Sequence, residues 1–361
     1  MTTVVVFRST DASAPVLTGA AGSLVALLHA CLVAGYGSGA QAAGAGWTSA
    51  YTATNKEAYR NSASDGTGFY LNVDDTGTGN TVKEAFVVGF ETMSAISTGT
   101  GQFPTSAQLN ITGSAPAGAL VCRKSNTADA TARAWTLISD DTVFYLFVET
   151  GDVINPTRPF LFMFGDIFSY KGSDAYRCMI IARNGANITS LWGANDWFAA
   201  LLSANITFLS NLLPGHFMAR SWNGLGSSIQ VGKHTDQIKM GAGQGSGMSG
   251  LGAAQGNTGN NTFITMGLGR NTSPTFPYPN GPDGGLYVAP IWVHHNGIVR
   301  GYLKGLWAPL HDRPLNHNDT YSGTGNMSGK SFLVQSILAW IGSNGGDDIG
   351  QVHIETSSTW S

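Results

Sequence analysis

Residues 134–148 read Ala-Trp-Thr-Leu-Ile-Ser-Asp-Asp-Thr-Val-Phe-Tyr-Leu-Phe-Val, and this stretch decides the fold class. Two runs of aromatic and β-branched residues, 134–138 and 143–148, flank the polar pair Asp140 and Asp141. Aromatic and β-branched residues favour strands, and adjacent aspartates are typical of a turn. The stretch therefore predicts a β-hairpin.

The same kind of run recurs along most of the chain and predicts further strands. Two runs, 160–168 and 178–182, carry apolar residues at consecutive positions, so we expect both faces of these strands to be covered. Asn296 and Gly297 form a dipeptide typical of a tight hairpin turn. The predicted strands lie at 4–7, 69–73, 84–90, 160–168, 178–182, 216–222, 228–233, 286–294, 298–303, 331–334 and 351–354.

Two short segments break the strand pattern and predict helices. Between residues 24 and 31, apolar side chains recur at helical spacing. Ser23 is placed to cap the amino end of this helix, and Gly35 is placed to end it. A second short helix is predicted at 195–203.

Glycine- and proline-rich segments predict long loops at 241–262 and 270–285. We therefore predict a mainly β protein made of β-sandwich-like units, with long Gly-rich loops and two short helices. Loop-like residues before the second helix indicate an N-terminal β domain at 1–184 with one short helix. A C-terminal β domain with Gly/Pro-rich loops would follow at 185–361, and a single domain is the alternative.

The composition is poor in charge. Asp, Glu, Lys and Arg make up 11% of the 361 residues, against about 25% in a typical soluble domain, while glycine contributes 48 residues. The net charge is −3 and no run of Lys or Arg occurs, so we expect no nucleic-acid partner. The apolar segment 24–34 is too short to span a bilayer, so we expect no membrane partner. A chain with so few charged residues must have a surface that is rich in Gly, Ser, Thr and Asn, that is buried against other subunits, or both.

Candidate cofactor and metal sites in the sequence have simpler structural explanations. The segment 241–262 has Gly-x-Gly spacings, but neither a following helix nor a Gly-Lys-Ser/Thr sequence accompanies them, so we expect no cofactor. The cysteines are few and far apart, which favours small buried residues in a reducing cytoplasm over a disulfide framework or a zinc site. A cluster in the last quarter of the chain matches no zinc spacing, and we interpret it as loop and turn residues rather than metal ligands. These residues are Cys31, Cys122 and Cys178, and in the cluster His294, His295, His311, His317, Asp312 and Asp319.

Candidate catalytic residues are also weighed against simpler explanations. Paired carboxylates serve glycosidases, but adjacent aspartates in Gly-rich segments are ordinary turn residues. No Gly-x-Ser-x-Gly sequence occurs, and Cys178 precedes an apolar strand, which makes it a poor nucleophile. We therefore expect no enzyme and no catalytic residue. The acidic pairs are Asp74–Asp75, Asp140–Asp141 and Asp347–Asp348.

Aromatic residues are numerous, with nine tryptophans and eleven tyrosines. Such residues can stack on sugars, and they also anchor β cores and subunit interfaces. We interpret most of them as core and interface residues and keep carbohydrate contact as the alternative.

Several stretches together carry a resemblance to a known family. They begin near the amino terminus, continue through the middle of the chain and close it, while residues 185–285 contribute little. The chain resembles a family of uncharacterised virion structural proteins encoded by tailed bacteriophages and prophages. The stretches are 8–19, 35–37, 46–48, 164–169, 173–177, 299–310 and 352–357.

The resemblance implies a location rather than a chemistry, because the family has no assigned activity. It implies a non-enzymatic component of the virion, in the tail, neck or capsid-accessory set, assembled in the host cytoplasm. The expected partners are other virion proteins, and the low charge and aromatic content favour a homo-oligomer. A receptor-binding protein for a host-surface glycan is the alternative, and a glycan depolymerase is a further one.

Overall fold

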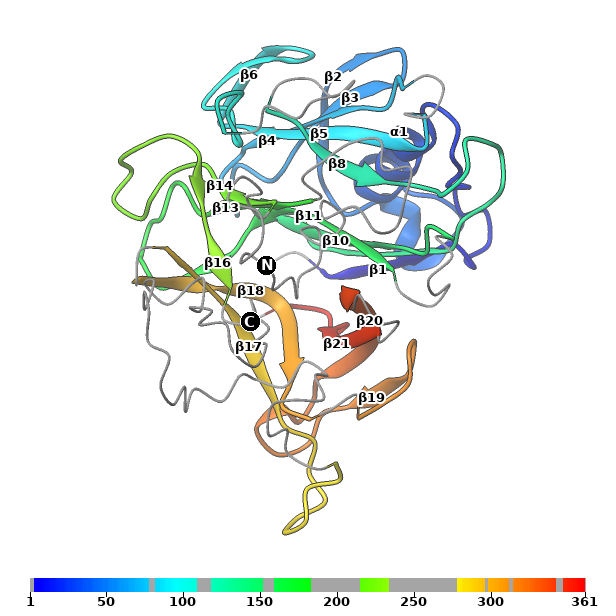
Figure 1. The fold of residues 1–361 in the computed structure, drawn as a ribbon, viewed down its shortest axis with the longest axis vertical. Coiled ribbons are helices and arrows are strands. Elements are labelled where there is room, and N and C mark those ends of the chain that lie inside the picture. Colours follow the sequence, from blue (N-terminus) through cyan, green and yellow to red (C-terminus); the bar gives the residue numbers. More distant parts are fainter. Residues whose placement is uncertain are drawn as a thin grey trace.

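The computed structural model of the chain describes residues 3–77, 82–108, 118–151, 159–182, 215–233, 278–295, 298–311, 314–341 and 347–360. In these residues the protein is mainly β, as the sequence predicted. Every strand pairing described is antiparallel, and three larger sheets stack as layers along the long axis of the molecule (Figure 1).

The middle sheet contains the hairpin of residues 134–148. The hairpin is confirmed, with Leu146 of one strand opposite Leu137 of the other. The order of this sheet is β1 (Val5–Arg8), β9 (Trp135–Ser139), β10 (Val143–Val148), β11 (Phe160–Asp166), β13 (Cys178–Ile181), β14 (His216–Met218) and β15 (Ile229–Gln230).

The upper sheet lies above the middle one in Figure 1 and is built from the first third of the chain. Its order is β2 (Thr48–Ala53), β3 (Lys56–Arg60), β4 (Tyr70–Asp74), β5 (Glu84–Phe90) and β8 (Leu120–Arg123). A separate small hairpin pairs β6 (Thr92–Ala95) with β7 (Thr98–Thr100).

The lower sheet combines the short strand β16 with the strands that follow residue 287. Its order is β16 (Gly232–Lys233), β17 (Val288–His295), β18 (Ile298–Pro309), β21 (Asp347–Glu355), β20 (Ser331–Ile341) and β19 (Thr320–Ser322). The short strand β12 (Phe168–Ser169) also pairs with β18, so the chain passes from the middle sheet to the lower sheet at Ile167.

The middle sheet is covered on both faces, as its consecutive apolar residues predicted. All of β10 is buried. Phe144 and Leu146 pack into the core shared with the upper sheet, whereas Tyr145 and Phe147 pack into the core shared with the lower sheet. This alternation is the period of two that a strand imposes on its side chains. The central strands therefore join two hydrophobic cores into one body.

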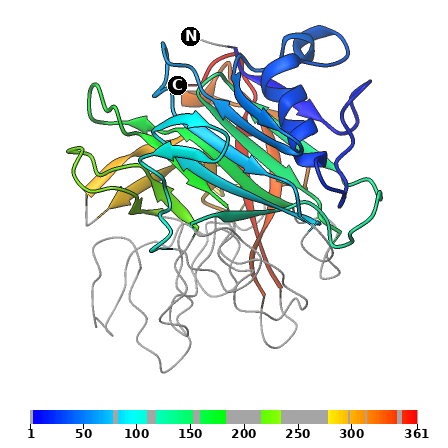
Figure 2. The same cartoon turned by 90° about the horizontal axis from the view of Figure 1, so that it is seen from above.

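The predicted amino-terminal helix is present, but its cap differs from the prediction. Helix α1 spans Ser23–Leu28, continues as a π-helix over His29–Ala34 and ends at Gly35, as expected. The N-cap residue is Gly22, with a φ of 81°. Because glycine has no side chain, the cap residue itself makes no side-chain hydrogen bond to the helix. The prediction of Ser23 as the cap is therefore wrong, because Ser23 is already helical and its hydroxyl donates to the Thr18 carbonyl at 2.8 Å. Figure 2 shows α1 beside the upper sheet and over the middle one.

Some sequence predictions lie outside the described residues. These are the second helix at 195–203, the Gly-rich segment 241–262 and the Asn296–Gly297 turn, although β17 and β18 on either side of that turn do pair antiparallel. The division between 184 and 185 stays a prediction. Strand β14, which follows that point, pairs with β13, which precedes it.

Candidate functional site

The aspartate pair in the β9–β10 hairpin forms a turn, as the sequence predicted. Asp140 Oδ1 accepts hydrogen bonds from the backbone N–H groups of Thr142 at 2.7 Å and Val143 at 2.8 Å. The Thr142 hydroxyl donates to the same oxygen at 2.8 Å. Because the Asp140 carboxylate closes its own turn, its position matches a structural role.

The Asp74–Asp75 pair is divided between two structural contacts. Asp74 accepts a hydrogen bond from Lys56 Nζ at 2.6 Å. Asp75 is fully buried, pairs with the buried Lys124 and accepts a hydrogen bond from the Leu24 N–H at 2.9 Å. Burial raises the pKa of Asp75 to about 6, against the opposing effect of Lys124. Asp75, the residue after β4, thus caps α1 from a distant part of the chain, which is the role that the sequence assigned to a local serine.

The histidines that are close in sequence make separate local hydrogen bonds. His311 Nε2 accepts from the Tyr287 N–H at 2.8 Å, and His317 Nδ1 accepts from the Ser336 N–H at 3.1 Å. Asp312 lies outside the described residues. Across the part of the chain that the structure describes, no three His, Cys, Asp or Glu side chains gather as metal ligands.

The other predicted candidates lie in strands. His294 and His295 end β17, where a register shift after Val293 leaves His294 buried and His295 partly exposed. Asp347 and Asp348 open β21, and their side chains fall outside the described part of the structure. These residues are therefore parts of strands β17 and β21, and their positions do not define a common site.

All three cysteines are free and buried. Burial raises the pKa of the Cys31, Cys122 and Cys178 thiols, so the reactive thiolate is disfavoured at neutral pH. Cys178 is therefore unsuited to nucleophilic attack in the folded protein.

A buried ion pair joins the middle and lower sheets near β12. Asp174 precedes β13, and Arg300 lies in β18. Arg300 Nε donates to Asp174 Oδ2 and Arg300 Nη2 donates to Asp174 Oδ1, both at 2.9 Å. The Asp174 side chain is 0% exposed and the Arg300 side chain is 2% exposed. A two-pronged guanidinium–carboxylate pair fixes orientation as well as distance.

The same guanidinium holds two further segments. Arg300 donates to the carbonyl oxygens of Tyr176, at 2.7 Å, and Arg220. The Ser169 hydroxyl donates to Asp174 Oδ2 at 2.7 Å. Three stretches on which the sequence resemblance rests, 164–169, 173–177 and 299–310, therefore meet at one buried pair.

An exposed aromatic cluster lies next to this pair, and we call it the aromatic platform. It consists of Phe168, Tyr170, Trp292 and Tyr302. The rings of Phe168 and Tyr302 stack with their centroids 4.6 Å apart, and Trp292 Nε1 donates to the Tyr170 hydroxyl at 3.0 Å. Phe168 is 41% exposed and Tyr170 is 57% exposed. Contiguous exposed apolar patches, unlike single exposed residues, mark interaction surfaces, and these side chains contact one another.

A glycine brings the platform's two strands together. Gly301 lies opposite Ser169 in the β12–β18 pairing. A Cβ at Gly301 would lie 1.7 Å from the Phe168 carbonyl oxygen, so any side chain there would push β12 away. The platform is not apparent in the sequence, because 160–168 has the pattern of one strand, whereas β11 ends at Asp166 and β12 begins at Phe168. The one sequence signal that the strand ends before Phe168 is Asp166, whose charge interrupts the apolar run.

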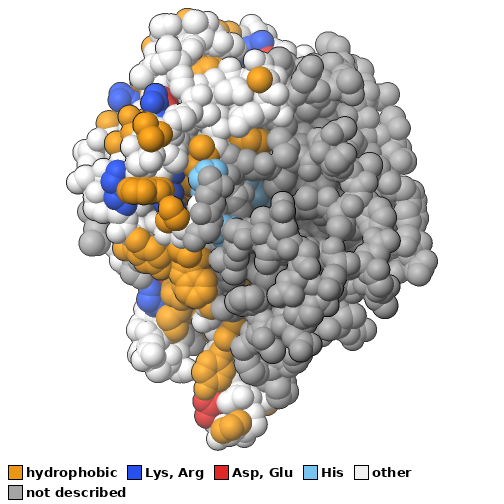
Figure 3. Space-filling view, turned by 60° about the vertical axis from the view of Figure 1, so that its left-hand side comes forward, with side chains coloured by type: hydrophobic (Ala, Val, Ile, Leu, Met, Phe, Trp, Pro, Cys, Tyr) orange, Lys and Arg blue, Asp and Glu red, His pale blue; other side chains and the backbone are white. Residues whose placement is uncertain are grey.

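The platform belongs to a face with many apolar groups. Figure 3 turns forward the side of the molecule on which β17 ends and β18 begins, and a band of hydrophobic side chains runs down it. Other exposed apolar residues, Trp222 and Val299, are each 43% exposed. Lys171 donates to the Trp222 carbonyl at 2.7 Å, which ties the loop after β14 to the platform's margin.

Comparisons with known proteins add no relative to these observations. A scan against protein-family models and a search of curated proteins both find no match to the chain. The helices in the described residues are too short or too polar to cross a lipid bilayer.

Proposed function

We propose that this protein is a non-enzymatic structural component of a tailed-phage virion and that it acts by packing against other protein subunits. The observation that carries the proposal is the aromatic platform, an ordered apolar surface on a chain with only 11% charged residues. Interfaces are enriched in aromatic residues and depleted in charge at their centre, and the platform has this composition.

The platform can supply the centre of an interface. If a full aromatic side chain has about 200 Å² of surface, the exposed parts of Phe168 and Tyr170 amount to roughly 200 Å². At about 25 cal/mol per Å², burying this area contributes about 5 kcal/mol before the costs of association. A stable interface needs about 800 Å² from each partner, so the platform is an anchor within a larger contact.

A second copy of this chain is the first partner we propose. The net charge of −3 gives two copies little mutual repulsion at physiological ionic strength. Ordered support from the Asp174–Arg300 pair means that the surface loses little conformational freedom on association. Other virion proteins are the further partners expected from the sequence resemblance.

Mass spectrometry of purified virions, combined with lysine-reactive cross-linking, tests this proposal. We expect the chain in the particle, with Lys171 beside the platform linked to another subunit. Absence of the chain from virions would overturn the proposal. A parallel incubation of the purified chain with host polysaccharide addresses the alternatives from the sequence, because cleavage products would identify a depolymerase instead.

A further inference from the structure

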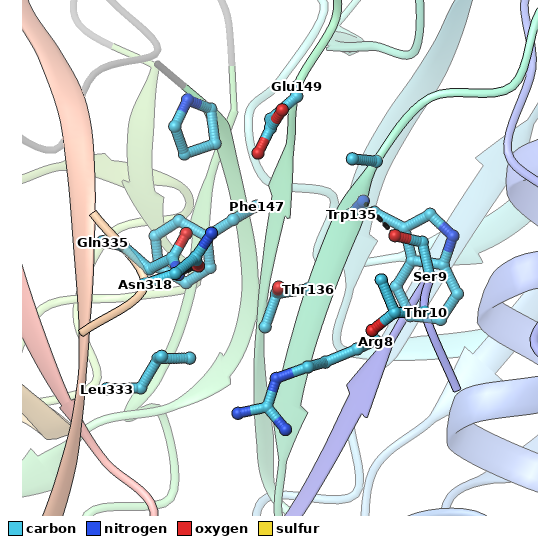
Figure 4. A pocket seen from close by; sticks show the side chains of 12 residues that line it. Arg8, Ser9, Thr10, Trp135, Thr136, Phe147, Glu149, Asn318, Leu333 and Gln335 are labelled. Atoms are coloured by element: carbon cyan, nitrogen blue, oxygen red, sulfur yellow. Dashed lines mark hydrogen bonds between the residues drawn. The ribbon is translucent and has the colours of Figure 1, made fainter. Parts of the chain in front are cut away.

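A polar cavity lies between the middle and lower sheets, away from the aromatic platform. Its volume is about 370 Å³, which is within the range of sites for small ligands. The middle sheet contributes residues from β1, β9 and β10, and the lower sheet contributes residues from β20 and the loop before β19. Figure 4 shows these side chains converging on the space between the strands.

The floor of the cavity is a row across three strands. Arg8 pairs in register with Thr136, and Thr136 pairs with Phe147. Directly opposite residues lie on the same face of a sheet and in contact distance. The row therefore presents a guanidinium, a hydroxyl and an aromatic ring side by side to the cavity.

Arg8 carries a charge without a counterion. Within the described residues, no hydrogen bond or ion pair is formed by its guanidinium, and its backbone N–H alone bonds Asp11 at 2.7 Å. In Figure 4 the Arg8 side chain points into the cavity from one end, and Glu149 lies at the other. An arginine fork fits a carboxylate with two parallel hydrogen bonds.

The remaining polar groups suit hydroxyl groups on a ligand. Gln335 Nε2 donates to Asn318 Oδ1 at 2.7 Å, which leaves the Asn318 amide NH₂ to donate outward. Glu149 has a side chain 31% exposed and contacts His317 at 3.4 Å, so its second oxygen can accept. Hydroxyl groups both donate and accept, and this mixture of donors and acceptors matches them.

We propose that this cavity binds a sugar acid, with the carboxylate on Arg8 and the hydroxyl groups on Thr136, Asn318 and Glu149. Phe147 and Leu333, each 1% exposed, form the apolar back wall of the same space. A phosphate dianion is less suited, because the cavity has one unpaired cation and a carboxylate facing it. The ligand is a free sugar acid or a uronic acid unit of an acidic glycan.

Calorimetric titration of the full chain tests this assignment. The probes are glucuronate, glucose, and a short oligosaccharide that ends in glucuronate. We expect glucuronate to bind at least about tenfold more tightly than glucose, which corresponds to about 1.4 kcal/mol. Tighter binding of the oligosaccharide would identify a glycan as the source, and equal or weaker binding would identify the free acid.

Two variants and a control locate the binding. Arg8→Gln should remove the preference for glucuronate, whereas Arg60→Gln, on β3 of the upper sheet, should leave it unchanged. Asn318→Asp, at an exposed position with a φ of 68° that aspartate tolerates, should weaken glucuronate binding at least about threefold without unfolding the chain. The proposal is overturned if glucose and glucuronate bind with the same affinity, or if neither glucuronate nor the oligosaccharide binds. It is also overturned if folded Arg8→Gln keeps the preference for glucuronate.

Discussion

Replacing Asp174 by Asn should destabilise the protein strongly and locally. The substitution keeps the size of the side chain and removes its charge, so the buried Arg300 guanidinium loses its counterion. Arg300 would keep its bonds to the carbonyls of Tyr176 and Arg220, but these neutral acceptors do not offset a buried charge.

The magnitude follows from the burial of the pair. With exposures of 0% and 2%, the removal of one partner should lower the free energy of unfolding by about 3–5 kcal/mol. Chemical denaturation followed by tryptophan fluorescence measures this loss. Limited trypsin digestion should also show faster cleavage after Lys171, because the segment between β12 and β13 loses its anchor.

The pH dependence gives an independent measurement of the same pair. Burial by itself raises the pKa of Asp174, but hydrogen bonds from Arg300 and Ser169 outweigh it and hold the pKa below its ordinary value. A lowered folded-state pKa stabilises the protein above the unfolded value of about 3.9, and this stability is lost as the pH falls through the folded value. Asp174→Asn should remove that part of the acid dependence.

A double variant separates the pair from its surroundings. Asp174→Asn combined with Arg300→Met should lose at least about 1 kcal/mol less than the sum of the single losses, because no unpaired charge remains. Strictly additive losses, or a loss below about 1 kcal/mol for Asp174→Asn, would refute the claim that this pair supports the platform.

Three further predictions test the fold. Burial lowers the pKa of His353 to about 3. The neutral imidazole therefore stabilises the folded protein fully above about pH 6.5, and about 2 kcal/mol of the free energy of unfolding should be lost at pH 5. In denaturation curves, His353→Asn should abolish this loss. Phe164→Ala should cost about 3–5 kcal/mol in the same assay, because Phe164 is fully buried against Phe103. Gly301→Ala should separate β12 from β18, detected as faster hydrogen exchange at the Tyr170 amide, and unchanged exchange would contradict the close approach.

The strands were the most predictable part of this protein. The bounds of β5 and β10 match the sequence prediction, because each is an apolar run that ends at polar residues. The coverage of β11 on both faces was also predictable, because the apolar residues occupy consecutive positions and so point to both faces of the sheet. These features depend on neighbouring residues in the sequence, so they can be predicted without knowledge of the tertiary structure.

Features that depend on distant residues were not predictable. Asp75 bonds the Leu24 N–H across 51 positions, and Arg300 reaches Asp174 across 126. The sequence shows each of these residues as an isolated charge, since its partner is brought close only by the stacking of sheets. The passage of the chain from one sheet to another at Ile167 has the same origin.

Sedimentation velocity of the purified chain tests the proposed assembly role most directly. We expect the wild-type protein to form oligomers at micromolar concentration. The double variant Phe168→Ser with Tyr170→Ser should shift it to monomers, and Val16→Ser, which changes a residue 62% exposed outside the platform, should not. A wild-type chain that stays monomeric at high concentration, or a double variant that oligomerises as the wild type does, would contradict the account.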